Sequence, residues 1–266
     1  VCPSAGPTLF ADAANGTPLA TTPPPTGAQS PAQCRFGLLA DGLSAANARG
    51  PGSVVRAVGW SAALPGGVMS FTVPGAIRLG PGVSLTSDAP PGAARYVVIA
   101  PDTGSTSFLK LGAGAGISAF AIQNSACTAN AIESDCGTGT DPITVSDVAV
   151  NGTGTTGSPP RRFRSGVYHS GGCPLVLESS IIRGAGESGL VLTTSSTTTA
   201  RILGNVISGN DATTTYPFLS VARKGGWRVL SVAAPGAIGV RGHPLTIRVG
   251  AGIAIGFAGL ALLLWP

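Results

Sequence analysis

Four acidic side chains lie close together near the middle of this 266-residue chain. They are Glu133, Asp135, Asp141 and Asp147, and glycines lie among them. Carboxylate oxygens in a glycine-bearing loop suit Ca²⁺, which takes about six to eight oxygen ligands. The sequence therefore offers Glu133, Asp135 and Asp141 as candidate calcium ligands, calcium being the one cofactor it suggests. The alternative is an ordinary turn whose acidic side chains are solvated.

Asp147 and two further side chains, Arg183 and His169, are candidates for contact with a ligand. His169 precedes Gly171 and Gly172, where an imidazole could act as a general base, although no serine or cysteine nucleophile motif lies beside it. A histidine that is simply hydrogen-bonded at a strand end is the alternative. A groove in which Arg183 and Asp147 converged would favour an enzyme, whereas a face of Ser, Thr and Gly would favour a binding protein. The sequence assigns no catalytic residue.

The five cysteines suggest an oxidising compartment, because disulfides persist outside the cytosol. Their spacing matches no zinc motif. Cys127 and Cys136 flank a polar loop that a disulfide would close, and a bond between Cys2 and Cys34 would hold the amino-terminal segment. Cys173 would then be left over, and five unrelated thiols are the alternative. The chain begins without Met, which is compatible with a removed leader, so we expect a secreted or cell-surface protein.

The net charge of +5 does not indicate a nucleic-acid partner. A surface that binds phosphates concentrates its basic residues on one face, and here they are scattered along the chain. The one local cluster, Arg161, Arg162 and Arg164, follows two prolines and is typical of a solvated loop. We therefore expect no nucleic acid among the partners.

A short sequence pattern recurs between Pro142 and Asn210 and predicts the fold. Each copy begins with a short stretch of alternating apolar and polar residues, followed by a small or amide residue. A second short apolar run comes next, and a Gly or Asn ends the copy. The copies are Ile143–Gly152, Leu175–Gly184 and Ala200–Gly209, with a fainter one at Phe120–Asn124. Intervals of about 25 to 33 residues are typical of stacked repeats of strand and corner. Because aromatics make up only 5% of the chain, we expect a narrow interior of Val, Ile, Leu and Ala.

The repeat makes specific predictions for single residues. We expect Ile181 and Val206 to stack coil upon coil, so that a charge at either position would destabilise the array. We expect Asn124, Asn151 and Asn205 to lie at corners and to satisfy backbone groups with their amides. The polar segment from Asn151 to Pro160 should leave the stack as a loop.

One helix is predicted ahead of the strands. It runs from Phe36 to about Ala48, ends at Gly50-Pro51-Gly52, and is followed by a strand over Ser53–Val58 and by the strand-forming run Ile77–Leu85. The helix places four apolar side chains near one face: Leu38, Leu39, Leu43 and Ala46.

This succession of a helix ending in Pro-Gly and the strands after it resembles the start of right-handed parallel β-helix proteins. These proteins belong to the pectate-lyase-like superfamily, and the chain looks in particular like the secreted branch of that superfamily in high-GC bacteria. The resemblance covers about residues 35 to 210. It implies an all-β, right-handed parallel β-helix (solenoid) with a short N-terminal capping helix over the open end of the coils.

The resemblance also suggests two functions. Hydrolases and lyases of this superfamily use paired carboxylates, or calcium-binding acids with an arginine base, and its Asn-Thr-Asp, Asp-Asp and Gly-His-Gly motifs are absent here. The first hypothesis is therefore an exported, non-catalytic surface or matrix protein that binds polysaccharide or a cell-surface glycan. The second is a polysaccharide lyase or glycoside hydrolase acting on acidic glycans, which rests on fold resemblance alone.

The chain divides into three parts. Residues 1–34 form an irregular lead-in, and residues 35–211 form the β-helix with its capping helix. In residues 212–266 strands are still expected over Trp227–Val232 and Leu245–Val249, but the register to earlier coils is lost. The uncharged end, Val249 to Pro266, is either a last coil or a membrane anchor, since it would span about 27 Å as a helix.

Overall fold

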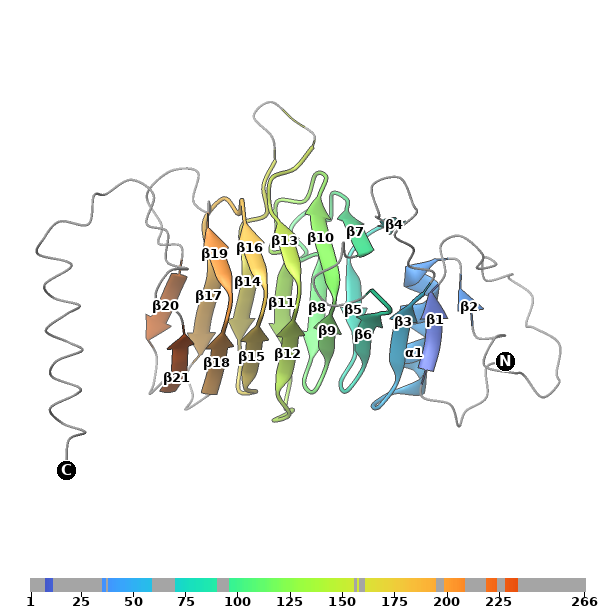
Figure 1. The fold of residues 1–266 in the computed structure, drawn as a ribbon, viewed down its shortest axis with the longest axis horizontal. Helices are drawn as coiled ribbons and strands as arrows, with labels where there is room; N and C mark the ends of the chain where they lie inside the picture. The colour runs from blue at the N-terminus through green and yellow to red at the C-terminus, as the bar shows by residue number, and fades with distance from the viewer. Residues whose placement is uncertain are drawn as a thin grey trace, which may run out of the picture.

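The chain winds into a parallel β-solenoid of about five turns. The computed structural model describes residues 8–11, 35–36, 38–58, 70–89, 96–155, 157, 161–194, 199–208, 219–223 and 228–233. From β3 onward, successive strands enter sheets A, B and C in turn, and each pairs with the strands one turn before and after it (Figure 1). The predicted all-β parallel solenoid is confirmed. Val249–Pro266 and Leu245–Val249 lie outside the described residues.

Three parallel sheets form the walls of the solenoid. Sheet A contains β2 (Arg35–Phe36), β1 (Thr8–Ala11), β3 (Val54–Ala57), β6 (Ser84–Ser87), β9 (Gly116–Ser118), β12 (Ile143–Ser146), β15 (Leu175–Glu178), β18 (Thr199–Leu203) and β21 (Arg228–Ala233). Sheet B contains β4 (Ser70–Thr72), β7 (Tyr96–Ala100), β10 (Phe120–Asn124), β13 (Ala149–Asn151), β16 (Ile181–Arg183) and β19 (Val206–Ser208). Sheet C contains β5 (Ile77–Leu79), β8 (Leu109–Gly112), β11 (Ile132–Asp135), β14 (Ser165–Ser170), β17 (Ser188–Thr194) and β20 (Leu219–Arg223).

Aliphatic columns fill the interior, as expected from the composition. Alternation along each strand turns every second side chain inward, and the parallel register places inward residues of successive coils above one another. The middle column of sheet A is Val55, Leu85, Ile117, Val145 and Leu177, all buried. Aromatic rings stack only near the amino-terminal end of sheet B within the described part, where Phe71, Tyr96 and Phe120 follow one another at centroid distances of 5.9 and 6.1 Å.

The helix α1 (Leu39–Arg49) lies at the amino-terminal end of the stack (Figure 1). It buries Leu39, Gly42, Leu43 and Ala46, and Gly50 ends it with a φ of 89°. The Asn47 side chain joins it to the first coil by accepting the Gly80 N–H and donating to the Arg78 carbonyl, both at 2.7 Å. Leu38 was predicted on the buried face but is 48% exposed, because the helix begins one residue after it.

A single left-handed residue turns the chain from sheet A into sheet B. Ala119, Asp147, Ser179 and Gly204 occupy this corner in successive coils, with φ between 51° and 64°. Each of the first three donates its N–H to the next coil, to the carbonyls of Ser146, Glu178 and Leu203. A lone residue in this conformation redirects the chain sharply, and it is tolerated here because cross-coil bonds fix the backbone.

Two of the three predicted corner asparagines bind backbone groups as expected. Asn124 is fully buried; its amide nitrogen donates to the carbonyls of Cys127 and Gly152, and its oxygen accepts the Cys127 N–H. Asn205 accepts from the Ser180 N–H and donates to the Leu177 carbonyl. Asn124 and Asn151 are the last residues of β10 and β13, so the predicted corner position is one residue early for both.

The chain leaves the stack after β13, as predicted. Thr153 and Arg162 form an isolated antiparallel bridge at the base of this loop, whose described residues leave the solenoid in Figure 1. Arg161 forms an ion pair with Asp102 in the loop after β7. The Gly104 N–H, and after it the Arg161 guanidinium, hold the pKa of Asp102 below its usual value.

Strand pairing extends further in both directions than the sequence indicated. β1 lies in the segment expected to be irregular, and it pairs with β2 and β3 at the edge of sheet A. Beyond Asp211, β20 pairs with β17 and β21 pairs with β18. The expected loss of register is therefore wrong for these strands, where one irregularity occurs between Ala200 and Ile202.

The inward face of β16 differs from the prediction. Ile182 is 1% exposed and stacks between Val150 and Ile207, whereas Ile181 and Val206 lie on the outer face. A charge at Ile181 or Val206 would therefore meet solvent, and the large destabilisation expected from the sequence does not follow. Ile181 and Val206 do stack on each other, but outside the solenoid, and Val206 is 41% exposed.

This matched pair of isoleucines allows a direct test of the register. We expect Ile182→Ala to cost about 2 to 5 kcal/mol of unfolding free energy, because it opens a cavity in the interior. Ile181→Ala should cost less than about 1 kcal/mol, because it removes a partly exposed side chain. Urea unfolding of the two variants measures the difference, and equal losses would contradict the assigned inward face.

Candidate functional site

Two of the three candidate calcium ligands, Glu133 and Asp135, are engaged by protein partners. Glu133 and Asp135 lie on the outer face of β11. The Glu133 carboxylate accepts the Ser107 hydroxyl and lies 3.5 Å from the amide nitrogen of Asn130. Asp141 is exposed in the corner before β12. Within the described ranges, no three His, Cys, Asp or Glu side chains form a group that could hold a metal ion, so we do not propose the calcium site further.

Asp135 is paired with a residue two strands away. Its carboxylate lies 2.9 Å from Nη2 of Arg78 on β5, although β8 runs between the two strands. The β8 residue opposite Asp135 is Gly112, which has no side chain to block the approach. Both partners are partly exposed, so the pair contributes at most about 1 kcal/mol.

Arg183 and Asp147 do not converge. Asp147 lies at the corner between sheets A and B, and Arg183 ends β16 opposite Asn151. Because Asn151 follows Asp147 by four residues of mostly extended chain, the two backbones are separated by about 13 Å along the strand direction. The groove that would have favoured an enzyme is not formed by this pair.

His169 points into the solenoid. It is fully buried on β14, with Leu192 of β17 as its register partner. Burial lowers its pKa from 6.5 to about 4, because the charged imidazolium is disfavoured away from water, and a hydrogen bond with the Cys173 backbone partly opposes this. The imidazole is therefore neutral at pH 7 and lies away from the outer faces where a polymer could bind.

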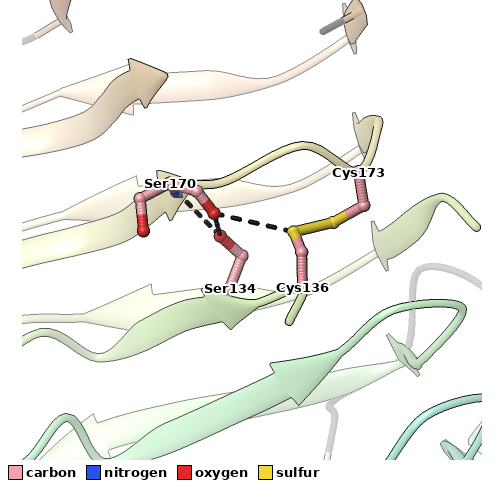
Figure 2. Close-up of a disulfide and its surroundings, with 4 residues drawn as sticks. All are labelled: Ser134, Cys136, Ser170 and Cys173. Carbon is pink, nitrogen blue, oxygen red and sulfur yellow. Dashed lines mark hydrogen bonds between the residues drawn. A yellow bond between two sulfur atoms is a disulfide. The ribbon is translucent and has the colours of Figure 1, made fainter. Parts of the chain in front are cut away.

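The disulfide joins a pair of cysteines that we did not predict. Cys136 and Cys173 are bonded with a Cα–Cα distance of 5.7 Å (Figure 2). Cys127 is a buried free thiol. The predicted Cys127–Cys136 bond is wrong because the two residues lie at opposite ends of β11. That strand alone spans about 10 Å, whereas disulfide Cα atoms lie roughly 4.4 to 6.8 Å apart. Cys2 and Cys34 lie outside the described residues.

The sequence did contain a signal for the observed pairing. Cys136 follows β11 directly, and Cys173 follows β14, the next strand of sheet C. Residues at equivalent corners of successive coils lie one above the other. Cysteines separated by about one repeat are therefore better partners than cysteines at the two ends of one strand.

The surface that sequence reasoning missed is the outer face of sheet A. Three successive strands carry the alternating tripeptides Ser84-Leu85-Thr86, Gly116-Ile117-Ser118 and Thr144-Val145-Ser146. The middle residue of each points inward and is buried, so the outer residues form a grid of hydroxyls around Gly116. Every residue of this grid is partly exposed, and the Ser118 hydroxyl donates to Oγ1 of Thr86 at 3.0 Å.

A shallow hollow of about 260 Å³ lies in this hydroxyl grid. Its lining residues are Ser84, Leu85, Gly114, Gly116, Ile117, Ser118 and Thr144. Gly116 creates it by having no side chain between Ser84 and Thr144. The backbone does not require glycine there, because a Cβ would lie 3.5 Å from Ser84 Oγ and 3.7 Å from Thr144 Cβ, both ordinary contacts.

Comparison of the chain with protein-family models, curated proteins and solved structures finds no match. In the part of the chain that the structure describes, no helix has the length and apolar character needed to cross a membrane.

The buried imidazole predicts a specific acid sensitivity. Below pH 6.5 the unfolded chain binds a proton at His169 that the folded chain does not, so stability falls as the pH is lowered from 6.5 to about 4. The loss amounts to about 3 kcal/mol, since each pKa unit corresponds to about 1.4 kcal/mol. His169→Leu should remove this component, and urea unfolding from pH 7 to pH 4 would show it. Parallel pH profiles for the two proteins would contradict the assignment.

Proposed function

We propose that this protein is an exported, non-catalytic β-solenoid that binds neutral polysaccharide on the outer face of sheet A. The observation that carries the proposal is the hydroxyl-lined hollow at Gly116. The surface or matrix role expected from the sequence is compatible with an elongated solenoid that offers one long side to a polymer.

The chemistry of the hydroxyl grid suits a polymer that is itself rich in hydroxyls. Serine and threonine hydroxyls both donate and accept, so they can match sugar hydroxyls in either orientation. Equivalent positions recur about every 4.8 Å from coil to coil, which lets an extended chain meet several of them. Each hydrogen bond contributes only about 0.5 to 1.5 kcal/mol, so useful affinity requires several contacts at once.

The lining of the hollow favours a neutral over a charged ligand. None of the residues that line it carries a charge. An ionised group brought into such a site would lose hydration without gaining an ion pair, which is unfavourable. Acidic glycans are therefore the weaker candidates for this hollow, although Arg56 and Glu178 flank the hydroxyl grid on the neighbouring strands.

Export is supported by the disulfide between Cys136 and Cys173, a bond that persists outside the reducing cytosol. We also propose, from the likeness of the amino-terminal helix and strands, that the chain belongs to the pectate-lyase-like superfamily and to its secreted bacterial branch.

The first test fills the hollow without disturbing the strand. Gly116→Val should reduce affinity for the bound polysaccharide at least tenfold, since the added side chain occupies the space that the sugar would use. Ala121→Val is the matched control, because Ala121 lies partly exposed on the outer face of sheet B. Titration calorimetry with soluble glucan, xylan and mannan measures the binding.

Two outcomes would overturn the proposal. Gly116→Val could bind as well as the unaltered protein, or the folded, unaltered protein could bind none of these polymers. If the Ala121→Val control lost binding equally, the site would lie elsewhere.

The enzyme hypothesis can be tested with the same preparations. Glu133 and Asp135 share the outer face of β11, but the Ser107 hydroxyl and Arg78 already engage them. We therefore expect neither new reducing ends nor unsaturated products from acidic or neutral polysaccharides, with or without calcium. Product that disappears in Glu133→Gln would replace the binding hypothesis with a hydrolase or lyase on sheet C.

A further inference from the structure

The corners between sheets C and A differ in length from coil to coil. They comprise residues 113–115 after β8, residues 136–142 after β11 and residues 171–174 after β14. The middle corner is the longest, so its backbone cannot follow the corners of both neighbouring coils. A mismatch of this kind separates the strands on either side of it.

The pairing of β11 with its two neighbours shows where the strands separate. β8 and β11 stay paired up to Gly112 and Asp135, whereas β11 and β14 are paired only through Ile132–Val167 and Glu133–Tyr168. Beyond that point a side chain replaces the backbone ladder. The Ser134 hydroxyl accepts the Ser170 N–H at 2.8 Å and donates to the Ser170 carbonyl at 3.0 Å (Figure 2).

The disulfide lies directly after this interruption. Cys136 is two residues beyond Ser134, and its sulfur lies 3.6 Å from the Ser170 carbonyl oxygen. This contact is not a hydrogen bond, because the sulfur belongs to a disulfide and carries no hydrogen. Cys173 belongs to the corner that continues from His169. Cys173 follows His169 by four residues, and both side chains are fully buried, so the corner held by the disulfide lies beside the buried ring.

We propose that the Cys136–Cys173 disulfide is a redox latch that keeps these two corners closed over His169, and that its reduction opens them locally to water. The proposal is independent of polysaccharide binding. It rests on the interrupted ladder, the serine bridge and the position of the covalent bond.

The reductant required is a dithiol. One thiolate attacks a sulfur of the disulfide to give a mixed disulfide, and the second thiol then displaces the remaining cysteine. Two electrons pass to the protein, both dithiol protons end on Cys136 and Cys173, and the reductant leaves as a cyclic disulfide. After this exchange, the Ser134 hydroxyl remains as the bridge to Ser170 beyond the paired part of the two strands.

Opening of the corner would expose His169 to protonation. Its register partner on β17 is Leu192, and the carboxylates of β11, Glu133 and Asp135, lie on the opposite, outer face. No charged side chain contributes to its pKa, which burial alone lowers. Water at the corner would therefore return the imidazole toward its ordinary pKa, near 6.5.

The test compares the oxidised full chain with the same chain treated with dithiothreitol, and with Cys136→Ser/Cys173→Ser, which removes this disulfide alone. Amide hydrogen exchange at Ser170 reports on the corner, and exchange at Ile122 in sheet B reports on the rest of the solenoid. NMR titration of His169, in a His243→Gln background to leave one imidazole signal, gives the second readout. Cys127→Ser is the matched control for a cysteine outside the latch.

We expect reduction and the double variant to accelerate Ser170 exchange at least tenfold and to raise the His169 midpoint by at least one pH unit. Ile122 exchange and the Cys127→Ser control should be unchanged. Unaltered Ser170 exchange and an unaltered His169 midpoint would overturn the latch. Equal acceleration at Ile122 would overturn it too, since the bond would then stabilise the whole fold rather than one corner.

Discussion

The parallel register between successive coils is the constraint on which the rest of this structure depends. Each residue lies about 4.8 Å from its equivalent one turn away, so an inward position must suit its neighbours on both sides. The column Val55, Leu85, Ile117, Val145 and Leu177 meets this requirement with aliphatic side chains of similar size. A polar residue in such a column, such as His169 beside Leu192, is held neutral because the neighbouring coils leave no space for water.

Corners, rather than strands, carry the irregularity of the solenoid. Strands have a fixed rise and must stay in register, so insertions accumulate where the chain turns. At the corner between sheets A and B, one left-handed residue suffices in several successive coils. At the corner between sheets C and A, lengths differ and the ladder between β11 and β14 ends early. There the serine bridge and the disulfide supply the cross-coil connections that backbone pairing supplies elsewhere.

Sequence reasoning succeeded where a periodic pattern determined the structure. The recurring sequence pattern predicted the parallel solenoid, and Gly50 predicted the end of the helix. It failed where the pattern did not show which residue faces the interior. In Ile181-Ile182 both residues are apolar, so alternation alone does not say which of them points inward. It also paired cysteines by nearness along the chain, whereas stacking brings Cys136 to a residue one coil away. The hydroxyl grid was present in three tripeptides but becomes visible only once their strands are adjacent.

The outer faces are free to diverge because packing restricts only the inward positions. Sheet C uses that freedom for charges that satisfy one another, as Asp135 does with Arg78. Its carboxylates are thus already bound, and a ligand would have to displace those partners and bear the cost of separating them. Sheet A instead presents partly exposed hydroxyls around a position with no side chain. A ligand there displaces water and breaks few internal bonds, which is why the uncharged hollow, between Arg56 on one neighbouring strand and Glu178 on the other, is the better candidate for binding a polymer.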